Sequence, residues 1–256
     1  MKTDEFYDND DELTLAEHEL LYQSVINHYA LNKEAYRHIR EGFSRRLGML
    51  ECSRLFLREH ANREPTDPPS PYLIDEMNVH LNSFYINLRG CMDNLAWALN
   101  YRFALVAGTE TDLSTRRKID LFGKDFLAAL ETQRPNLRDS LRQYESWVWD
   151  DLKELRDPVA HRVPLSVIGG VLPAERVAEF ESISSQAALP DGERNGHSRS
   201  HFMMKAHKLA EYVPLMILSN VSGLEPREIS AQIGSDYRQF LAIAKLIFAD
   251  FRAAAS

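Results

Sequence analysis

Arg156 and His161, in the run Arg156-Asp-Pro-Val-Ala-His161, have side chains that could act together on a phosphate. A guanidinium binds phosphate oxygens through two parallel N–H donors and stabilises negative charge as it develops. An imidazole exchanges protons near neutral pH, so it can take a proton from a hydroxyl or give one to a leaving oxygen. The pair therefore predicts phosphodiester chemistry that needs no metal.

The spacing of the pair requires a break in the helix that carries it. On a straight helix five residues turn a side chain by about 500°, which leaves the two groups about 140° apart. Pro158 lies between them and disfavours helical geometry at Asp157. We therefore expect the helix to bend or end there, with Asp157 capping the new turn, so that the guanidinium and the imidazole approach one phosphate.

Three further residues are candidates for support of this pair. Arg162 would add a phosphate contact, and Asp157 or Asp93 would orient the imidazole or hold the guanidinium. Asp93 also follows Arg89 by four residues, a spacing typical of a surface ion pair. A structural role stays open for the pair itself, in which the guanidinium caps a helix end and the imidazole bonds a loop carbonyl.

Other recognisable chemistry is absent from the sequence. It contains no glycine-rich phosphate loop and no GxSxG, HExxH or CxxC motif, so we expect no cofactor. His197, His201 and His207 are expected to be ordinary exposed histidines, which leaves no metal site. Two pairs with similar spacing, Arg54 with His60 and Arg194 with His201, are expected to be chance matches.

The composition indicates that helices position the pair. Eleven glycines among 256 residues are few for a sandwich or a barrel, which needs frequent turns. Hydrophobic residues at 44% and charged residues at 27% are typical of a globular protein. The net charge of −8 argues against a broad basic face that coats nucleic acid, but it leaves room for a small basic cleft.

The apolar spacing predicts an all-α protein, an elaborated up-and-down bundle of long antiparallel helices. We expect an acidic tail over 1–13 and a single domain over 14–256. Helices are predicted over 14–60 (one, or two joined near Asn32), 77–98, 125–132, 135–155, 202–216 with a kink at Pro214, and 235–251. The proline-rich stretch 62–71 is predicted to be a connection, and 163–172 a minor hairpin.

The termini and cysteines bear on location. The acidic N-terminus is unlike a targeting peptide, and no apolar run is long enough to cross a bilayer. Cys52 and Cys91 have no paired spacing and are expected to be reduced thiols. The sequence therefore predicts a cytoplasmic protein without a membrane contact.

Trp147 and Trp149 are expected to pack in the core or at an interface rather than to stack on bases.

The motif around Arg156 resembles that of the HEPN superfamily, in which a histidine follows an arginine by four to six residues and a polar residue follows the arginine directly. A second run, Asn87-Leu-Arg-Gly-Cys-Met-Asp93-Asn-Leu-Ala-Trp97, resembles the helix before the motif helix in uncharacterised bacterial HEPN-like proteins. The two likenesses cover about 74–164. They imply a helical bundle that dimerises with both motifs facing one cleft.

The resemblance also implies an activity. Many HEPN proteins are metal-independent ribonucleases that act as toxins or in defence, by attack of the 2′-hydroxyl on the phosphodiester. Arg156 and His161 would then be catalytic, and the partners would be a second copy, an RNA substrate and an antitoxin or nucleotidyltransferase. Two alternatives stay open: an inactive HEPN-like module that binds a nucleotide or a protein, and a bundle unrelated to that superfamily.

Overall fold

The computed structural model describes residues 19–20, 31–64, 66, 68–161, 164–218 and 226–254, without the side chains of 158–161, 191 and 218. The acidic tail over 1–13, the predicted helix start at residue 14, and Arg162 lie outside the described residues. Of the described residues 73% are helical, and these residues contain one small sheet of three strands, which confirms the predicted all-α class. None of the described helices combines the length and the apolar character that crossing a membrane requires.

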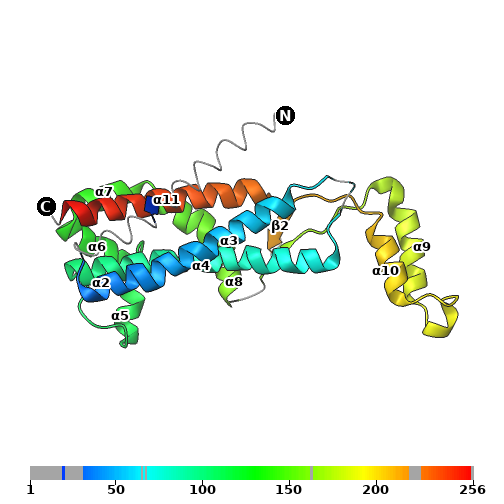
Figure 1. Ribbon diagram of the computed structural model, residues 1–256, viewed down its shortest axis with the longest axis horizontal. Helices are drawn as coiled ribbons and strands as arrows, with labels where there is room; N and C mark the ends of the chain where they lie inside the picture. Colours follow the sequence, from blue (N-terminus) through cyan, green and yellow to red (C-terminus); the bar gives the residue numbers. More distant parts are fainter. Residues whose placement is uncertain are drawn as a thin grey trace. The chain divides into compact units, whose positions relative to one another are not determined.

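The helices follow one another along the chain with short connections (Figure 1). They are α2 (Lys33–Arg37), the π-helix η2 (His38–Phe43), α3 (Ser44–Ala61), α4 (Pro71–Phe103), α5 (Leu113–Lys118), α6 (Lys124–Gln133), α7 (Pro135–Arg142), the π-helix η3 (Trp147–Leu152), α8 (Lys153–His161), the short 3-10 helix η4 (Ala174–Arg176), α9 (Val177–Ala188), the short 3-10 helix η5 (Asp191–Glu193), α10 (Arg199–His207) and α11 (Ile229–Ala253). The predictions over 77–98, 125–132 and 235–251 are confirmed within α4, α6 and α11.

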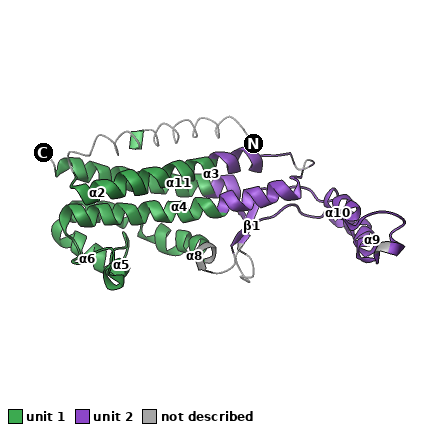
Figure 2. Ribbon diagram, turned by 60° about the horizontal axis from the view of Figure 1, so that its bottom comes forward, with its two compact units in different colours: residues 1–54, 82–162, 233–256 green, residues 55–81, 163–232 purple. Residues whose placement is uncertain are grey.

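The chain divides into two compact units (Figure 2). Unit 1 comprises Met1–Arg54, Asn82–Arg162 and Ile233–Ser256, and unit 2 comprises Leu55–Leu81 and Val163–Gln232. All of the predicted site residues belong to unit 1. The single domain over 14–256 stays a prediction.

In unit 1 the long helices α3, α4 and α11 lie side by side (Figures 1 and 2). Their directions follow from the contacts Phe84–Tyr237, Phe103–Phe251, Phe43–Phe248 and Arg54–Tyr237. The middle of α4 meets the first half of α11 and the ends of the two helices also meet, so they run in the same direction. The α3 helix runs opposite to both.

Asp236 ties three elements of this core together. Its carboxylate is fully buried and accepts hydrogen bonds from the Tyr85 hydroxyl at 2.9 Å and from Trp147 Nε1 at 2.8 Å. The three residues lie on α11, α4 and η3. Because hydrogen bonds to a buried charge are strong, and leaving its donors unpaired is costly, this carboxylate fixes where η3 begins.

The prediction of one continuous core helix over 135–155 is wrong. The α7 helix ends at Arg142, and the chain continues through the π-helix η3 into α8. Trp147, Val148 and Leu152 are all buried, and Trp147 and Leu152 are separated by the five residues of a π-type repeat. The wider turn of the π-helix therefore places these side chains together on the side that faces the core, whereas an α-helix would distribute them around its surface.

Unit 2 corrects two further predictions. Residues 163–172 do not form a local hairpin, because β1 (Leu165–Val167) pairs antiparallel with β2 (Leu215–Leu218), which also pairs with β3 (Arg227–Glu228). The helix predicted over 202–216 ends at His207, before Pro214, which cannot donate an intrahelical hydrogen bond.

In the N-terminal region, Asn32 caps α2 by accepting from the Ala35 amide, as the alternative of two helices requires.

Replacing Asp236 tests its role in the core. Asp236→Ala leaves the buried Tyr85 hydroxyl and Trp147 Nε1 without their acceptor, so we expect it to lower the unfolding free energy by about 3 kcal/mol. Asp236→Asn keeps one carbonyl acceptor and should lower it by less. Urea unfolding of the full chain, followed by circular dichroism, measures both against the exposed control Asp139→Ala. An Asp236→Ala variant as stable as this control would contradict the assignment.

Candidate functional site

A small hollow in unit 1, with a volume of about 140 Å³, brings two predicted site residues together. Arg156 and Asp157 enter it from α8. The remaining lining residues come from α4, the segment after α5, η3 and the start of α8: Arg89, Asp120, Val148, Trp149, Leu152 and Lys153. The hollow therefore has cations and carboxylates around it, with an indole at its edge.

The Arg156 guanidinium is partly exposed and is held by its chain neighbour. Its Nη1 donates to Asp157 Oδ1 at 2.9 Å, and 29% of the side chain is exposed. A guanidinium carries five N–H donors, so the bond to Asp157 leaves capacity for a further oxyanion. This contact is the one that the predicted role of Asp157 in holding the arginine requires, and the role itself stays a prediction.

Arg89 joins two carboxylates at the floor of the hollow. Its Nη2 donates to Asp120 Oδ2 at 2.5 Å, and its Nε lies 3.2 Å from Asp93 Oδ1. The ion pair with Asp93 was expected at the surface, but only 15% of the Arg89 side chain is exposed. Burial alone would lower the pKa of Arg89, and the carboxylates of Asp93, Asp120 and Asp157 outweigh it and raise that pKa.

Asp93 is the third predicted site residue that the structure places in this region. Burial raises the pKa of Asp93, and the nearby Asp120 adds to this effect. Arg89, Arg156 and Arg46 act in the opposite direction without cancelling it. Asp93 therefore belongs to the same charge network as Arg156, through its pairing with Arg89.

The predicted end of the helix at Pro158 is wrong, whereas the alternative of a bend there stays a prediction. The α8 helix continues from Lys153 to His161, so Asp157 caps no new turn. The proline removes only one intrahelical amide bond near the end of the helix, which the helix tolerates. On a regular helix Arg156 and His161 would point about 140° apart. The His161 side chain lies outside the described residues.

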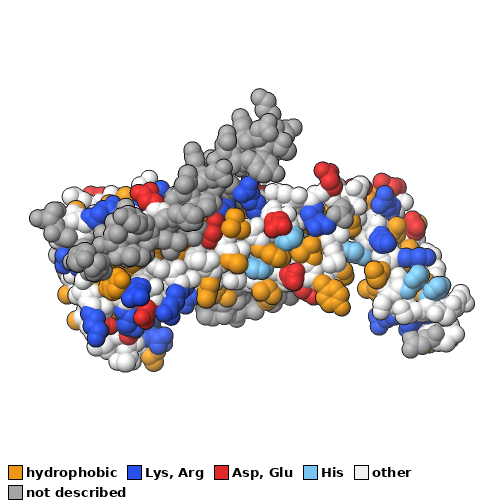
Figure 3. All heavy atoms as spheres, in the orientation of Figure 1, with side chains coloured by type: hydrophobic (Ala, Val, Ile, Leu, Met, Phe, Trp, Pro, Cys, Tyr) orange, Lys and Arg blue, Asp and Glu red, His pale blue; other side chains and the backbone are white. Residues whose placement is uncertain are grey.

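A basic run lies on the segment that leads to the hollow. Arg116, Arg117 and Lys118 are consecutive and exposed at the end of α5, two residues before Asp120. Figure 3 shows Lys and Arg side chains gathered at the α5 end of unit 1, with a few acidic groups among them. An acidic chain therefore carries a local cluster of cations next to Asp120.

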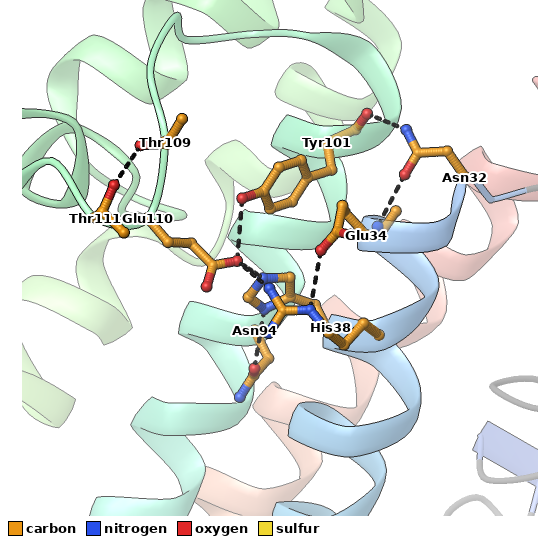
Figure 4. Close-up of polar contacts among 10 residues, drawn as sticks. Asn32, Glu34, His38, Asn94, Tyr101, Thr109, Glu110 and Thr111 are labelled. Carbon is orange, nitrogen blue, oxygen red and sulfur yellow. Dashed lines mark hydrogen bonds and ion pairs between the residues drawn. The ribbon is translucent and has the colours of Figure 1, made fainter.

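A second polar cluster was not predicted from the sequence. His38 Nε2 and Glu110 Oε1 lie 2.5 Å apart, and the same oxygen accepts from Arg37 Nη2 at 2.6 Å and from the Tyr101 hydroxyl at 3.1 Å (Figure 4). The imidazole stacks on Tyr101 and on Trp97. These contacts join η2, the end of α4 and the loop before α5.

The other side of His38 is closed by Asn94. His38 Nδ1 lies 3.3 Å from Asn94 Oδ1, while Asn94 Nδ2 donates to the Gly90 carbonyl at 2.6 Å. A Cβ at Gly42 would lie 1.9 Å from Asn94 Oδ1, so glycine is required for this approach. Both ring nitrogens of His38 thus face protein acceptors, which makes the cluster a brace for the loop. The only feature of the sequence that indicates this cluster is the helical spacing of Asn94, Trp97 and Tyr101.

Within the described ranges, no group of three or more His, Cys, Asp and Glu side chains is arranged to hold a metal ion. Comparison of the chain with protein-family models, with curated proteins and with solved structures finds no match. The site is therefore described by its own geometry, which is a charged hollow beside an exposed indole.

Substitutions at Arg89 and Asp93 separate the two members of the ion pair. Arg89→Met leaves Asp93 and Asp120 without their shared cation, and because 45% and 27% of these two side chains are exposed, we expect a loss of only about 2 kcal/mol of unfolding free energy. Asp93→Asn removes a carboxyl whose pKa burial raises, so at pH 7 it should stay within about 1 kcal/mol of the wild type. Urea unfolding at pH 7 compares them. Equal losses in both variants would contradict this account.

The pH dependence of stability tests the Glu110 brace. Burial would raise the pKa of Glu110, but bonding to His38, Tyr101 and Arg37 lowers it overall. A lowered pKa contributes stability above the ordinary value of 4.5, which is lost as pH falls through the folded-state pKa. We expect Glu110→Gln to be about 1 kcal/mol less stable at pH 7, with the difference closing below pH 4.5.

Thermal unfolding between pH 3 and pH 7 measures the difference between wild type and Glu110→Gln. Glu34→Gln, which alters an exposed ion pair of Arg37 at 3.0 Å, is the control and should change stability less. A Glu110→Gln deficit that is the same at pH 3 and at pH 7 would show that the carboxylate charge plays no part.

Proposed function

We propose that this protein is a metal-independent RNA endonuclease of the HEPN type, in which Arg156 binds the phosphate and His161 transfers the proton. The observation that supports it is the placing of Arg156 in a hollow with Lys153 and the exposed Trp149. Cations and an aromatic ring at one hollow are the groups that bind the phosphate and the base of a nucleotide.

The chemistry follows from the residue types. The Arg156 guanidinium binds the phosphate and stabilises the charge that develops as the ribose 2′-hydroxyl attacks it. His161 takes the proton of that hydroxyl or gives one to the leaving 5′-oxygen. The products are a 2′,3′-cyclic phosphate and a 5′-hydroxyl. Each chain supplies one such histidine, so the second proton transfer uses water or the histidine of a second copy.

The charge around the hollow sets the strength of binding. Asp157 holds Arg156, and Asp93 and Asp120 hold Arg89, so the cations of the hollow are largely neutralised. The exposed run 116–118 supplies further positive charge next to Asp120. RNA binding by this arrangement is weak, local and sensitive to salt.

The assembly belongs to the proposal as well. A homodimer in the cytoplasm would place two hollows along one RNA, which doubles the number of phosphate contacts. An antitoxin or a nucleotidyltransferase would be the partner that restrains the activity.

A second candidate function is a HEPN-like module that binds a nucleotide or a protein partner through the same hollow and cleaves nothing. The uninterrupted α8 favours it, because two positions five residues apart on a regular helix are separated by about 140° around its axis. In this case the hollow binds its ligand through Arg156 alone, without proton transfer.

Cleavage assays with variants of the motif decide between the two functions. The full chain is incubated with RNA in the presence of chelator, and the product ends are analysed. His161→Ala should reduce cleavage by about 100-fold or more, and Arg156→Ala by a similar factor. His201→Ala, at the histidine of the chance match with Arg194, is the matched control and should cleave as the wild type does.

The outcomes differ between the two proposals. Cleavage that His161→Ala retains would overturn the assignment of this site. Wild-type protein that binds RNA without cutting it, and loses binding in Arg156→Ala alone, would support the non-catalytic module. Circular dichroism of each variant shows that the fold is intact.

A further inference from the structure

A second hollow in unit 1, with a volume of about 500 Å³, adjoins the hollow at Arg156, because Trp149 lines both. The rest of the second hollow is formed by α6, α7 and the segments next to them: Phe122, Lys124, Leu127, Ala128, Glu131, Arg138 and Glu145. We propose that this second hollow binds the nucleobase next to the phosphate held at Arg156, with the base stacked on Trp149.

The inference rests on the proposed function, and the size of the two hollows supports it. A volume of about 500 Å³ is within the range of small-molecule sites, whereas 140 Å³ at Arg156 is below that range and suits a single phosphate group. A nucleotide has the same division into a larger base and a compact anion. The two hollows therefore match the two parts of one ligand.

The surface of the second hollow has the mixed character that a base requires. Phe122 and Leu127 are buried and give it an apolar floor, which suits the face of an aromatic ring. Arg138 and Glu145 give it a polar wall. Every nucleobase combines an apolar face with an edge that carries both donors and acceptors.

The polar wall combines a cation and a carboxylate. Arg138 Nη1 and Glu145 Oε1 form an ion pair at 2.5 Å, and Arg138 Nε lies 3.7 Å from Glu131 Oε2. A guanidinium carries five N–H donors, so Arg138 can donate to a further acceptor while it stays paired with Glu145. The wall can therefore donate to acceptors on the edge of a base.

Trp149 is placed for stacking rather than for the core. Its side chain is 43% exposed, whereas Trp147, two residues earlier, is 7% exposed and bonded to Asp236. Lys153 Nζ lies 5.3 Å from the centre of the Trp149 ring system, next to the Arg156 hollow. The indole thus has a cation on the phosphate side, and a base on the other side would extend the stack.

The experiment measures whether binding depends on the base and on the indole. The probe is a short RNA with 2′-O-methyl riboses, which cannot be cleaved by 2′-hydroxyl attack, and a second probe has the same backbone without bases. Affinities of the full chain for both are measured by fluorescence anisotropy at low salt. The wild type should bind the probe with bases about tenfold more tightly than the abasic probe.

Variants of Trp149 then assign that difference. Trp149→Ala should remove the tenfold preference and leave the affinity for the abasic probe unchanged, while Trp149→Phe should keep most of it. Tyr72→Ala removes an aromatic side chain that is 84% exposed in unit 2 and should change nothing. Arg156→Ala should weaken the binding of both probes by the same factor.

Three results would overturn the inference: equal binding of the two probes by the wild type, an unchanged preference in Trp149→Ala, or no binding of either probe. The result is separable from that of the cleavage assay. If His161→Ala abolishes cleavage but Trp149→Ala binds both probes as the wild type does, the nuclease assignment is supported and the base site is overturned. If no RNA is cleaved but the preference for the probe with bases depends on Trp149, the base site is supported and the nuclease assignment is overturned.

Discussion

The buried carboxylate of Asp236 is the constraint from which the geometry of the site follows. It accepts from Tyr85 on α4 and from Trp147 on η3, so it fixes the first residue of the π-helix against the bundle. With Trp147 held inward, the wide turn buries Val148 and Leu152 and leaves Trp149 at the surface. The same turn sets the starting point of α8, and hence the places of Lys153 and Arg156. A polar bond in the core thereby decides which side chains surround the hollow.

The α4 helix is the second element on which the site depends, and it accounts for a run that first suggested a family. Several residues between 87 and 97 have packing roles in unit 1. The contacts are Asn87 with Arg46, Arg89 with Asp93 and Asp120, Gly90 with the Arg46 guanidinium, Asn94 with Gly42 and His38, and Trp97 with His38. The resemblance of this run to HEPN-like proteins is therefore one that the packing of a helical bundle can produce without any shared activity.

The sequence predicted those parts of the molecule that depend on local periodicity. The stripe over 77–98 and the final helix were found because their apolar residues recur at helical spacing, and the burial of α4 and α11 confirms both. It did not predict η3, because a five-residue repeat within a helix looks like irregular spacing. The pairing of β1 with β2 joins residues about 50 positions apart, which no local pattern records. The prediction that the helix ends at Pro158 is wrong, since one missing amide near a helix end does not stop the helix.

For the site, residue types predict Arg156, Asp157 and Asp93, and the structure adds contacts that a short motif cannot contain. The i, i+4 spacing with Asp93 predicts Arg89 at the surface, where such pairs are common, because its second partner, Asp120, is distant in sequence. The His38 and Glu110 cluster was missed for the same reason, since its members are brought together only by the packing of η2 on α4. Tertiary contacts, more than motif chemistry, decide which charges are buried.

The charge arrangement also limits what the hollow can bind. A phosphate that approaches Arg156 meets the Asp157 carboxylate already on Nη1, and Arg89 is committed to Asp93 and Asp120. The anion must therefore share Arg156 with one carboxylate, and electrostatic attraction alone gives it little affinity in physiological salt. Affinity and selectivity then have to come from a group that salt does not screen. At this hollow the exposed indole of Trp149 is such a group, so recognition of a nucleotide would begin with its base and the phosphate would be positioned by the base.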